Sequence, residues 1–246
     1  MILPNQYTLD IMQHLTFEKI TMKLLGCPRN DLLYAQEDEK EKIKERLGLP
    51  TDKKIFLFAP TFRTNSSKTT DTNIERSGIR QLQEMDFLKL CNALAQQFGG
   101  DWVLVCRFHY HVADRIPWPE LEQKYPGSII NGNTCDDKAQ YLACTDVLLT
   151  DASSCMFDFA ITGKPCFLYF PDLRYYVEEE RGLYCDIQSL PFPLSESFDA
   201  LIDKITHFAN AAYQNGVAQM MDKFGYVDKP NMAYEVANYI LSENNL

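Results

Sequence analysis

The chain has 246 residues, of which 46% are apolar and 24% are charged, and its formal net charge is −10. This composition is that of a globular protein with a large core, and it excludes wholesale disorder. Proteins that wrap nucleic acid use clustered lysine and arginine, so the acidic balance argues against a nucleic-acid partner. A small phosphorylated ligand is not excluded, because screening limits the reach of distant carboxylates to roughly 8 Å at physiological salt.

Eight cysteines are scattered along the chain, and no two of them have the C-x-x-C spacing of a zinc ribbon or a thioredoxin-like motif. Several lie within apolar runs, which predicts reduced and buried thiols in a cytosolic protein. No basic stretch followed by an apolar run begins at Met1, and no apolar run approaches the roughly 20 residues that span a bilayer. We therefore expect a cytoplasmic protein.

Strand-like and helix-like segments alternate along the chain. In the first half, the predicted elements are a strand at 21–25, a helix at 36–47, a strand at 55–59, a loop at 64–80, a helix at 87–98 and a strand at 102–106. In the second half, they are a strand at 128–130, a helix at 137–144, a strand at 146–149, a helix at 153–162, a strand at 165–169 and helices at 197–212 and 230–243. This alternation predicts an α/β fold with a doubly wound parallel sheet.

Ligands of an open parallel sheet bind at the carboxyl ends of its strands, and there the sequence places its unusual polar residues. Three predicted strands are followed by such segments, which are Ala59–Arg63, Arg107–His111 and Thr150–Ser154, the last leading into Asp158. The sequence contains no G-x-x-x-x-G-K-[ST] or G-x-G-x-x-G motif and no G-x-S-x-G elbow. These familiar phosphate cradles and the nucleophile elbow are therefore excluded.

The segment Thr150–Ser154 precedes a predicted helix, which Asp151 or Ser153 can cap. Free backbone amides and the helix dipole then favour a phosphate at this point. The dipole contributes about 0.3–1 kcal/mol and each charge-assisted hydrogen bond about 1.5–3 kcal/mol, so direct hydrogen bonds would dominate. The alternative, that these residues only cap the helix, stays open.

Arg107, His109 and His111 alternate along the chain, so they share one face if the strand continues through them. Arginine can clamp a phosphate with two hydrogen bonds, and histidine can donate or accept a proton near neutral pH. A His-x-His pair can also bind a metal, but no third ligand accompanies it, so we expect phosphate chemistry and no metal site. Arg63 lies at another predicted strand end and could clamp a phosphate in the same way as Arg107. The alternative is that Arg63 is an ordinary solvated arginine.

Six short motifs follow one another across residues 26–186. They are GCPRND at Gly26–Asp31, APTFR at Ala59–Arg63, RFHY at Arg107–Tyr110, TDASSCMFD at Thr150–Asp158, KP at Lys164–Pro165 and RGLYCD at Arg181–Asp186. Their types and order resemble the G-x-P-R-N-D, A-P-T-[FW]-R, R-x-H-[PY], T-D-Y-S-S-x-x-F-D, K-P and R-G-x-Y-x-D motifs of CDP-glycerol glycerophosphotransferases. Each motif alone is weak, and the ordered set carries the resemblance.

The resemblance implies a two-lobed glycosyltransferase-B-like fold whose C-terminal, Rossmann-like lobe binds CDP-glycerol. In that family an acceptor hydroxyl attacks the β-phosphate of the donor and CMP leaves. Carried over to this chain, His109 and Arg107 are the catalytic residues, and His109 moves a proton or stabilises charge. The residues implied to bind the donor or its phosphates are Thr61, Arg63, Thr150, Asp151, Ser153, Ser154, Asp158 and Arg181. No cofactor is implied beyond CDP-glycerol as donor substrate, and phosphoryl transfer needs this kind of positioning and charge stabilisation.

Two features depart from the family pattern. Ala152 stands where the family usually has tyrosine, which puts donor stacking or packing at that position in doubt. Most of the N-terminal lobe, which carries the acceptor side in the family, is missing. We expect residues 1–34 to be a remnant of that lobe with its linker, 35–228 to form the nucleotide-binding lobe and 229–246 to form a C-terminal helix. Either the chain is truncated or a partner chain supplies the lobe.

The leading hypothesis is transfer of glycerol phosphate, or a similar polyol phosphate, from a CDP-alcohol to a cell-surface polymer or lipid-linked acceptor. Family members work at the inner face of the membrane, which implies possible peripheral membrane association. Three alternatives stay open: a non-catalytic module that only binds the CDP-alcohol, a sugar-nucleotide glycosyltransferase or epimerase on the same fold, and a metal hydrolase that uses His109 and His111.

Overall fold

The computed structural model describes residues 1–14, 20–63, 78–180 and 182–243. Its centre is a parallel sheet of six strands in the order β5-β4-β3-β6-β7-β8. The strands are β3 (Lys54–Phe58), β4 (Trp102–Cys106), β5 (Ile129–Asn131), β6 (Val147–Thr150), β7 (Cys166–Tyr169) and β8 (Leu194–Ser195). The predicted doubly wound parallel sheet is therefore confirmed, and β8 is an edge strand that the sequence analysis missed.

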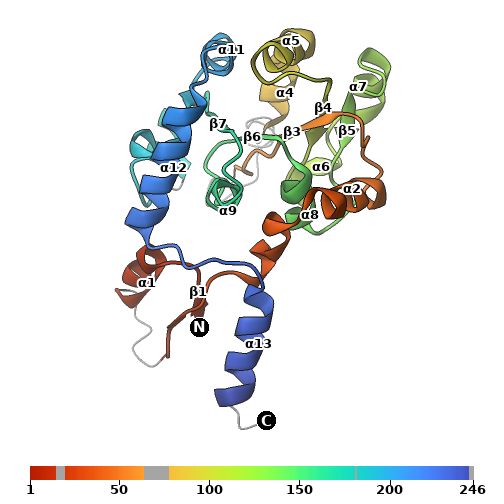
Figure 1. Ribbon diagram of the computed structural model, residues 1–246. Coiled ribbons are helices and arrows are strands. Elements are labelled where there is room, and N and C mark those ends of the chain that lie inside the picture. Colours follow the sequence, from red (N-terminus) through yellow and green to blue (C-terminus); the bar gives the residue numbers. More distant parts are fainter. Residues whose placement is uncertain (15–19, 64–77, 181, 244–246) are drawn as a thin grey trace.

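Continuous apolar runs build the central strands because both faces of the sheet are covered. All residues of β4, β6 and β7 are buried, and so are four of the five in β3. Helices α5 (Phe87–Phe98) and α11 (Phe198–Thr206) lie on one face of the sheet, and α8 (Lys138–Cys144) and α9 (Cys155–Ala160) lie on the other (Figure 1). Strands buried on both sides in this way are typical of parallel sheets.

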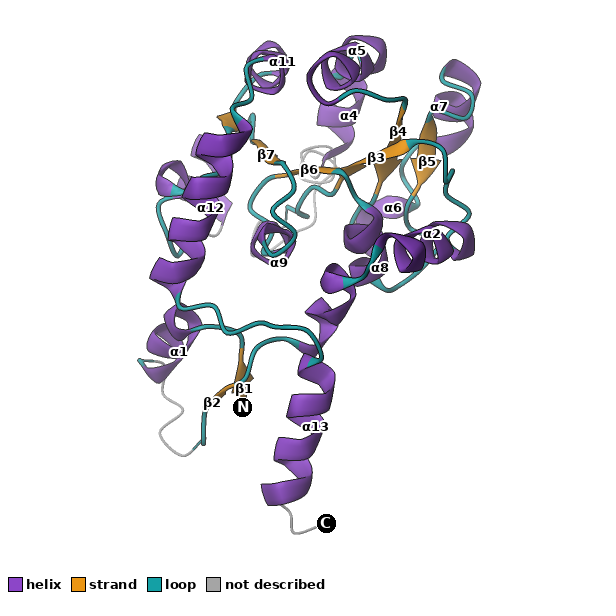
Figure 2. Ribbon diagram, viewed as in Figure 1, coloured by secondary structure: helices purple, strands orange, loops and turns teal. Residues whose placement is uncertain are grey.

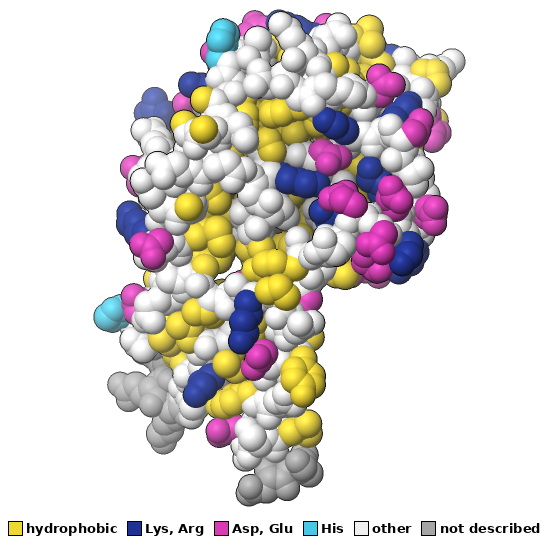
Figure 3. Space-filling model, in the orientation of Figure 1, with side chains coloured by type: hydrophobic (Ala, Val, Ile, Leu, Met, Phe, Trp, Pro, Cys, Tyr) yellow, Lys and Arg dark blue, Asp and Glu magenta, His cyan; other side chains and the backbone are white. Residues whose placement is uncertain are grey.

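The remaining elements surround this core or lie below it (Figure 2). They are α1 (Gln6–Gln13), α2 (Glu37–Arg46), α4 (Arg80–Glu84), α6 (Tyr110–Ala113), α7 (Trp118–Lys124), α10 (Leu173–Tyr175), α12 (Asn210–Phe224), α13 (Met232–Glu243), the 3-10 helices η1 (Pro28–Tyr34) and η4 (Ile187–Ser189), and the π-helix η3 (Tyr176–Glu180). Acidic and basic side chains mix over α2 and its surroundings instead of forming a basic patch (Figure 3). Within the described ranges, none of the helices combines the length and apolar character needed to cross a bilayer.

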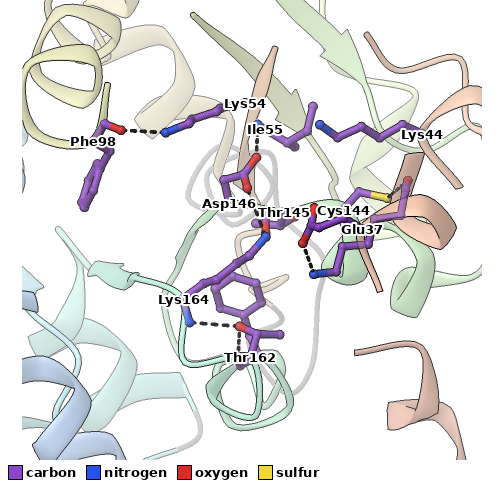
Figure 4. Close-up of polar contacts among 12 residues, drawn as sticks. Glu37, Lys44, Lys54, Ile55, Phe98, Cys144, Thr145, Asp146, Thr162 and Lys164 are labelled. Atoms are coloured by element: carbon purple, nitrogen blue, oxygen red, sulfur yellow. Dashed lines mark hydrogen bonds and ion pairs between the residues drawn. The ribbon is translucent and has the colours of Figure 1, made fainter. Parts of the chain in front are cut away.

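The amino-terminal edge of the sheet is held by polar contacts with the main chain (Figure 4). Asp146, just before β6, accepts hydrogen bonds from the Ile55 amide at 2.9 Å and from the Lys164 ammonium at 3.0 Å. Lys164 also donates to the carbonyl of Thr145 at 2.8 Å, and Lys54 donates to the carbonyl of Phe98 at 2.6 Å. The Lys164–Pro165 motif therefore lies at the edge opposite to the strand ends that carry the other predicted site residues.

The N- and C-terminal segments meet below the core. Strands β1 (Ile2–Leu3) and β2 (Lys23–Leu24) form a separate parallel pair, so the strand predicted at 21–25 is real but short. Asp31 in η1 accepts hydrogen bonds from the amides of Met232 at 2.7 Å and Ala233 at 2.9 Å, and so caps α13. Of the residues in α13, only Met232 is buried.

Two predictions of secondary structure need correction. The single helix predicted at 197–212 is two helices, α11 and α12, and the chain turns between Thr206 and Asn210. Most of α12 was not predicted. The loop predicted at 64–80 lies outside the described residues up to position 77, and Arg80 already begins α4.

Candidate active site

A cavity of about 940 Å³ opens at the carboxyl edge of the sheet. Its walls come from segments that follow four strands, within residues 59–62, 107–110, 131–136 and 153–155. Strands β3 and β6 are neighbours, but the chain leaves β3 for β4 on one side of the sheet and leaves β6 for β7 on the other. Open α/β sheets bind their ligands at such a reversal, so the cavity lies where a donor site is expected.

Asp151, directly after β6, ties the end of this strand to the loop after β3. Its Oδ1 accepts hydrogen bonds from the Thr61 amide, at 2.8 Å, and from the Thr61 hydroxyl, and its Oδ2 accepts one from Arg63 at 2.7 Å. The residue is only 1% exposed, so these donors, not water, compensate its charge. Asp151 therefore does not cap the following helix, and that part of the prediction is wrong.

Arg63 is fully buried, so the alternative of an ordinary solvated arginine is wrong as well. Its guanidinium forms ion pairs with Asp151 at 2.7 Å and with Asp172 at 2.9 Å, and it lies over the rings of Phe170 and Tyr176. Burial alone would lower the pKa of Arg63, but the two carboxylates outweigh it and raise that pKa above its ordinary value. The guanidinium does not line the cavity, and it donates hydrogen bonds to Asp151, Asp172 and the carbonyl of Thr61.

His109 lies in the cavity wall, in a turn and not in a strand. Strand β4 ends at Cys106 and α6 begins at Tyr110, so the predicted shared strand face of His109 and His111 does not exist. The His109 ring stacks on Phe62, with centroids 4.9 Å and planes 14° apart. Its Nδ1 accepts a hydrogen bond of 3.4 Å from the His111 amide, which places the proton of the neutral ring on Nε2.

Arg107 also lines the cavity, but its guanidinium is occupied by the main chain. It donates to the carbonyls of Gly132 and Cys135, each at 2.6 Å, and of Asp136 at 2.8 Å. The guanidinium carbon lies 5.1 Å from the centre of the Tyr141 ring. These three charge-assisted hydrogen bonds to carbonyls of one loop fix the conformation of the segment after β5. Arg107 therefore shapes one wall of the cavity.

The two serines after β6 lie in different surroundings. Helix α9 begins at Cys155, two residues later than predicted, and Ser154 is its N-cap residue without a side-chain hydrogen bond. Ser153 lines the large cavity, and its Oγ accepts a hydrogen bond of 3.4 Å from the Cys155 amide. Ser154 is exposed and lines a second cavity of about 360 Å³, which Asp158 lines too. The two serines expected to hold the donor phosphates thus border two different cavities.

The other predicted donor residues divide as follows. Thr150 is fully buried, and its hydroxyl donates to the carbonyl of Ala59 at 2.7 Å. Asp158 accepts two hydrogen bonds from Arg29, at 3.1 and 3.2 Å. Arg181 lies outside the described residues. The large cavity therefore brings together Thr61, Arg107, His109 and Ser153, while Arg63, Thr150 and Asp151 lie behind its wall.

Five polar residues of this cavity were not predicted, and they are Asp114, Asn131, Asn133, Asp136 and Lys138. The Lys138 side chain is half-buried and makes no hydrogen bond or ion pair with any residue that the structure describes. Asn133 pairs with the backbone of Phe108, donating to its carbonyl at 2.6 Å and accepting from its amide at 3.0 Å. Lys138 and Asn133 follow the strand predicted at 128–130, so their position after the carboxyl end of a strand is the signal that points to them.

Comparison with known proteins shows a family relationship that extends over nearly the whole chain. Residues 1–242 match the model of the family described as CDP-Glycerol:Poly(glycerophosphate) glycerophosphotransferase. A teichoic acid poly(glycerol phosphate) polymerase of Bacillus spizizenii is 33% identical over 98% of this chain and 58% of the relative. A teichoic acid glycerol-phosphate transferase of Staphylococcus aureus is 33% identical over 86% of this chain and 52% of the relative.

The chain also matches solved structures of a teichoic acid polymerase. A variant of the wall teichoic acid polymerase TagF, soaked with CDPG, is 26% identical and has a TM-score of 0.75, covering 98% of this chain and 56% of TagF. The chain thus spans about half the length of the relatives that it matches. The resemblance found in the ordered motifs is confirmed, and the chain belongs to the CDP-glycerol:poly(glycerophosphate) glycerophosphotransferase family.

Proposed function

We propose that this chain binds a CDP-alcohol, CDP-glycerol first among them, and that its large cavity presents the donor for transfer of the alcohol phosphate to a polyol-phosphate acceptor. The observation that carries the proposal is the convergence of Thr61, His109, Ser153 and Lys138 on one cavity at the reversal of the strand order. Family membership and the teichoic acid relatives support the same donor class.

The donor diphosphate lies against Ser153, Thr61 and Lys138 in this proposal. The Ser153 hydroxyl donates one hydrogen bond to a phosphate oxygen, whereas the Thr61 hydroxyl already donates to Asp151. The Lys138 ammonium supplies a positive charge, and it forms no ion pair with the described residues. His109 faces the same space, with its plane set by Phe62 and its Nε2 carrying a proton. One cation without an ion pair and the Ser153 hydroxyl can together hold a small anion, in a cavity whose lining also includes Asp114 and Asp136.

The transfer step balances without a cofactor. An acceptor hydroxyl oxygen forms a bond to the β-phosphorus of the donor, and the bond from that phosphorus to the bridging oxygen breaks, so that CMP leaves with the bond electrons. His109 donates a hydrogen bond from Nε2 to the phosphoryl oxygens, and the proton of the attacking hydroxyl passes to the phosphate of the departing CMP or to water. Arg63 acts indirectly in this proposal. It neutralises Asp151, which holds Thr61 in place beside Phe62 and the His109 ring.

Calorimetric titration of the chain with CDP-glycerol, CDP-ribitol, CMP and UDP-glucose tests the donor class. We expect a CDP-alcohol to bind more tightly than UDP-glucose. Ser153→Ala should weaken it about tenfold, since one hydrogen bond to a charged group contributes roughly 1.5 kcal/mol. The control is Ser242→Ala, at an exposed residue of α13. Tighter binding of UDP-glucose, or equal effects of Ser153→Ala and Ser242→Ala, would contradict the proposal.

A further inference from the structure

The second cavity, of about 360 Å³, lies between the N-terminal segment and the sheet domain. Tyr7 and Ile11 of α1 form one side, Phe157 and Asp158 of α9 another, and Phe224 at the end of α12 a third. Ser154 lines this cavity and the preceding residue, Ser153, lines the donor cavity. Two consecutive residues of the turn before α9 therefore line different cavities.

A cluster of charged and amide groups lies in one part of this second cavity. Arg29 holds Asp158 with two hydrogen bonds, and Asn30 donates to Asp158 at 3.4 Å and to Asp228 at 3.2 Å. The Arg29 side chain is 58% exposed, and its Nη1 makes no hydrogen bond with the described residues. The Oδ2 atom of Asp228 is buried without a hydrogen-bond partner among them. Donors and acceptors for a hydroxyl-rich ligand are thus both present.

Aromatic side chains form a large part of the remaining wall. Tyr7 stacks on Phe224 with centroids 4.6 Å and planes 21° apart, and Phe157 lies beside Phe224 at 5.9 Å. Tyr184 stands at the same cavity with 87% of its surface exposed. Apolar walls with a few convergent polar groups are the usual construction of a small-molecule site. Aromatic rings can pack on the carbon–hydrogen faces of a polyol or a sugar, while the charged cluster orients its hydroxyl groups.

We propose that this second cavity binds the hydroxyl-bearing end of the acceptor, which is a glycerol phosphate unit or a sugar ring. Part of the acceptor site then lies on this chain, in addition to the N-terminal lobe to which the family resemblance assigns the acceptor side. The proposal rests on the donor assignment above, since the attacking oxygen must come within roughly 3–3.5 Å of the phosphorus. Because Ser153 and Ser154 are consecutive, an acceptor end held beside Ser154 would lie one residue along the chain from a diphosphate held beside Ser153. Arg29 would meet the phosphate of a glycerol phosphate unit, and Asp158 and Asp228 its hydroxyl groups.

NMR titration of the whole chain tests this site, with glycerol 3-phosphate in one arm and N-acetylglucosamine in the other. We expect at least one of them to bind, and Tyr184→Ala to weaken it at least about fivefold, the effect of losing roughly 1 kcal/mol of contact. Tyr234→Ala is the matched control, because Tyr234 is a 68% exposed tyrosine on α13. Ile11→Trp, which fills the cavity from α1, should abolish binding. The arm that binds identifies the acceptor class.

Saturating CMP separates this inference from the donor assignment. We expect CMP to leave the affinity for the acceptor fragment unchanged or higher, because the two cavities are distinct. Displacement of the fragment by CMP, binding unaffected by both Tyr184→Ala and Ile11→Trp, or no binding in either arm would overturn the proposal. Fragment binding that depends on Tyr184 in a chain that binds no CDP-alcohol would instead overturn the donor assignment and leave the second site standing.

Discussion

Replacing Arg63 by methionine should destabilise the protein strongly. The substitution keeps a long apolar side chain between Phe170 and Tyr176 and removes the charge that faces Asp151 and Asp172. Asp151 is 1% exposed and cannot recover water without opening the end of β6. Removing one partner of a buried ion pair typically costs about 3–5 kcal/mol, so we expect a loss of that size in the free energy of unfolding.

The double variant Arg63→Met, Asp151→Asn shows whether the unpaired carboxylate causes the loss. An asparagine at position 151 keeps an oxygen for the Thr61 amide and removes the buried charge. The double variant should therefore recover about half of the lost free energy or more, since apolar or neutral replacement of a whole pair is often nearly neutral. Urea unfolding followed by circular dichroism gives the four free energies of the cycle.

The competing view makes Arg63 a direct ligand of the donor phosphates. In that case Arg63→Met would weaken donor binding more than tenfold and leave the urea midpoint near that of the parent protein. This result would refute the reasoning from burial and from the carboxylate partners. Lys89→Met provides a control for loss of an exposed cation, because the Lys89 ammonium pairs with an exposed Asp199 and should contribute less than about 1 kcal/mol.

Lys164→Met should lower the free energy of unfolding by roughly 1–3 kcal/mol in urea titrations, with unchanged CDP-alcohol affinity, because Lys164 bonds only at the amino-terminal edge. Lys138→Met should weaken CDP-alcohol binding about tenfold in calorimetry with little change in stability, and the reverse pattern would contradict its role. Burial raises the pKa of Asp228, so folding loses stability as pH rises from the unfolded to the folded pKa. Asp228→Asn should remove this fall of the free energy of unfolding with rising pH, measured by urea titrations between pH 4 and 8. Asp222→Asn, at an exposed site, should leave the pH dependence unchanged.

The main strands could be predicted from the sequence because burial on both faces leaves uninterrupted apolar runs such as 55–58 and 147–149. Once those strands were placed, parallel order brought their polar ends to one edge, and His109 and Ser153 do line the same cavity. Helix α12 was missed because its sequence carries Asn215 and Gly216 at its centre, which are poor helix formers, and only four of its residues are buried. The helix is therefore stabilised by the packing of its buried side chains against the core and not by the helix propensity of its sequence.

The partners of the polar residues could not be predicted in the same way. Arg63 has the local surroundings of a surface cation, and its partner Asp172 lies 109 positions further along the chain. Arg107 likewise binds carbonyls 25 to 29 positions away, and carbonyls leave no mark in a sequence. Residue types alone therefore identified which side chains lie near the site, while burial decided whether each one contacts solvent or other protein groups.

The cap that Asp31 provides has a consequence for how the molecule opens. Helix α13 has 12 residues, about the length at which an isolated helix is marginal in water, and Met232 is its only buried side chain among those described. Its helical state therefore depends on the two amide hydrogen bonds to Asp31 and on few other contacts. Amide hydrogens of this helix should exchange with solvent deuterium through local fraying, while those of β3 and β4 exchange only through global unfolding. The helix is thus a separate cooperative unit, and its stability depends on the side chain of Asp31, which lies 201 positions before Met232 in the chain.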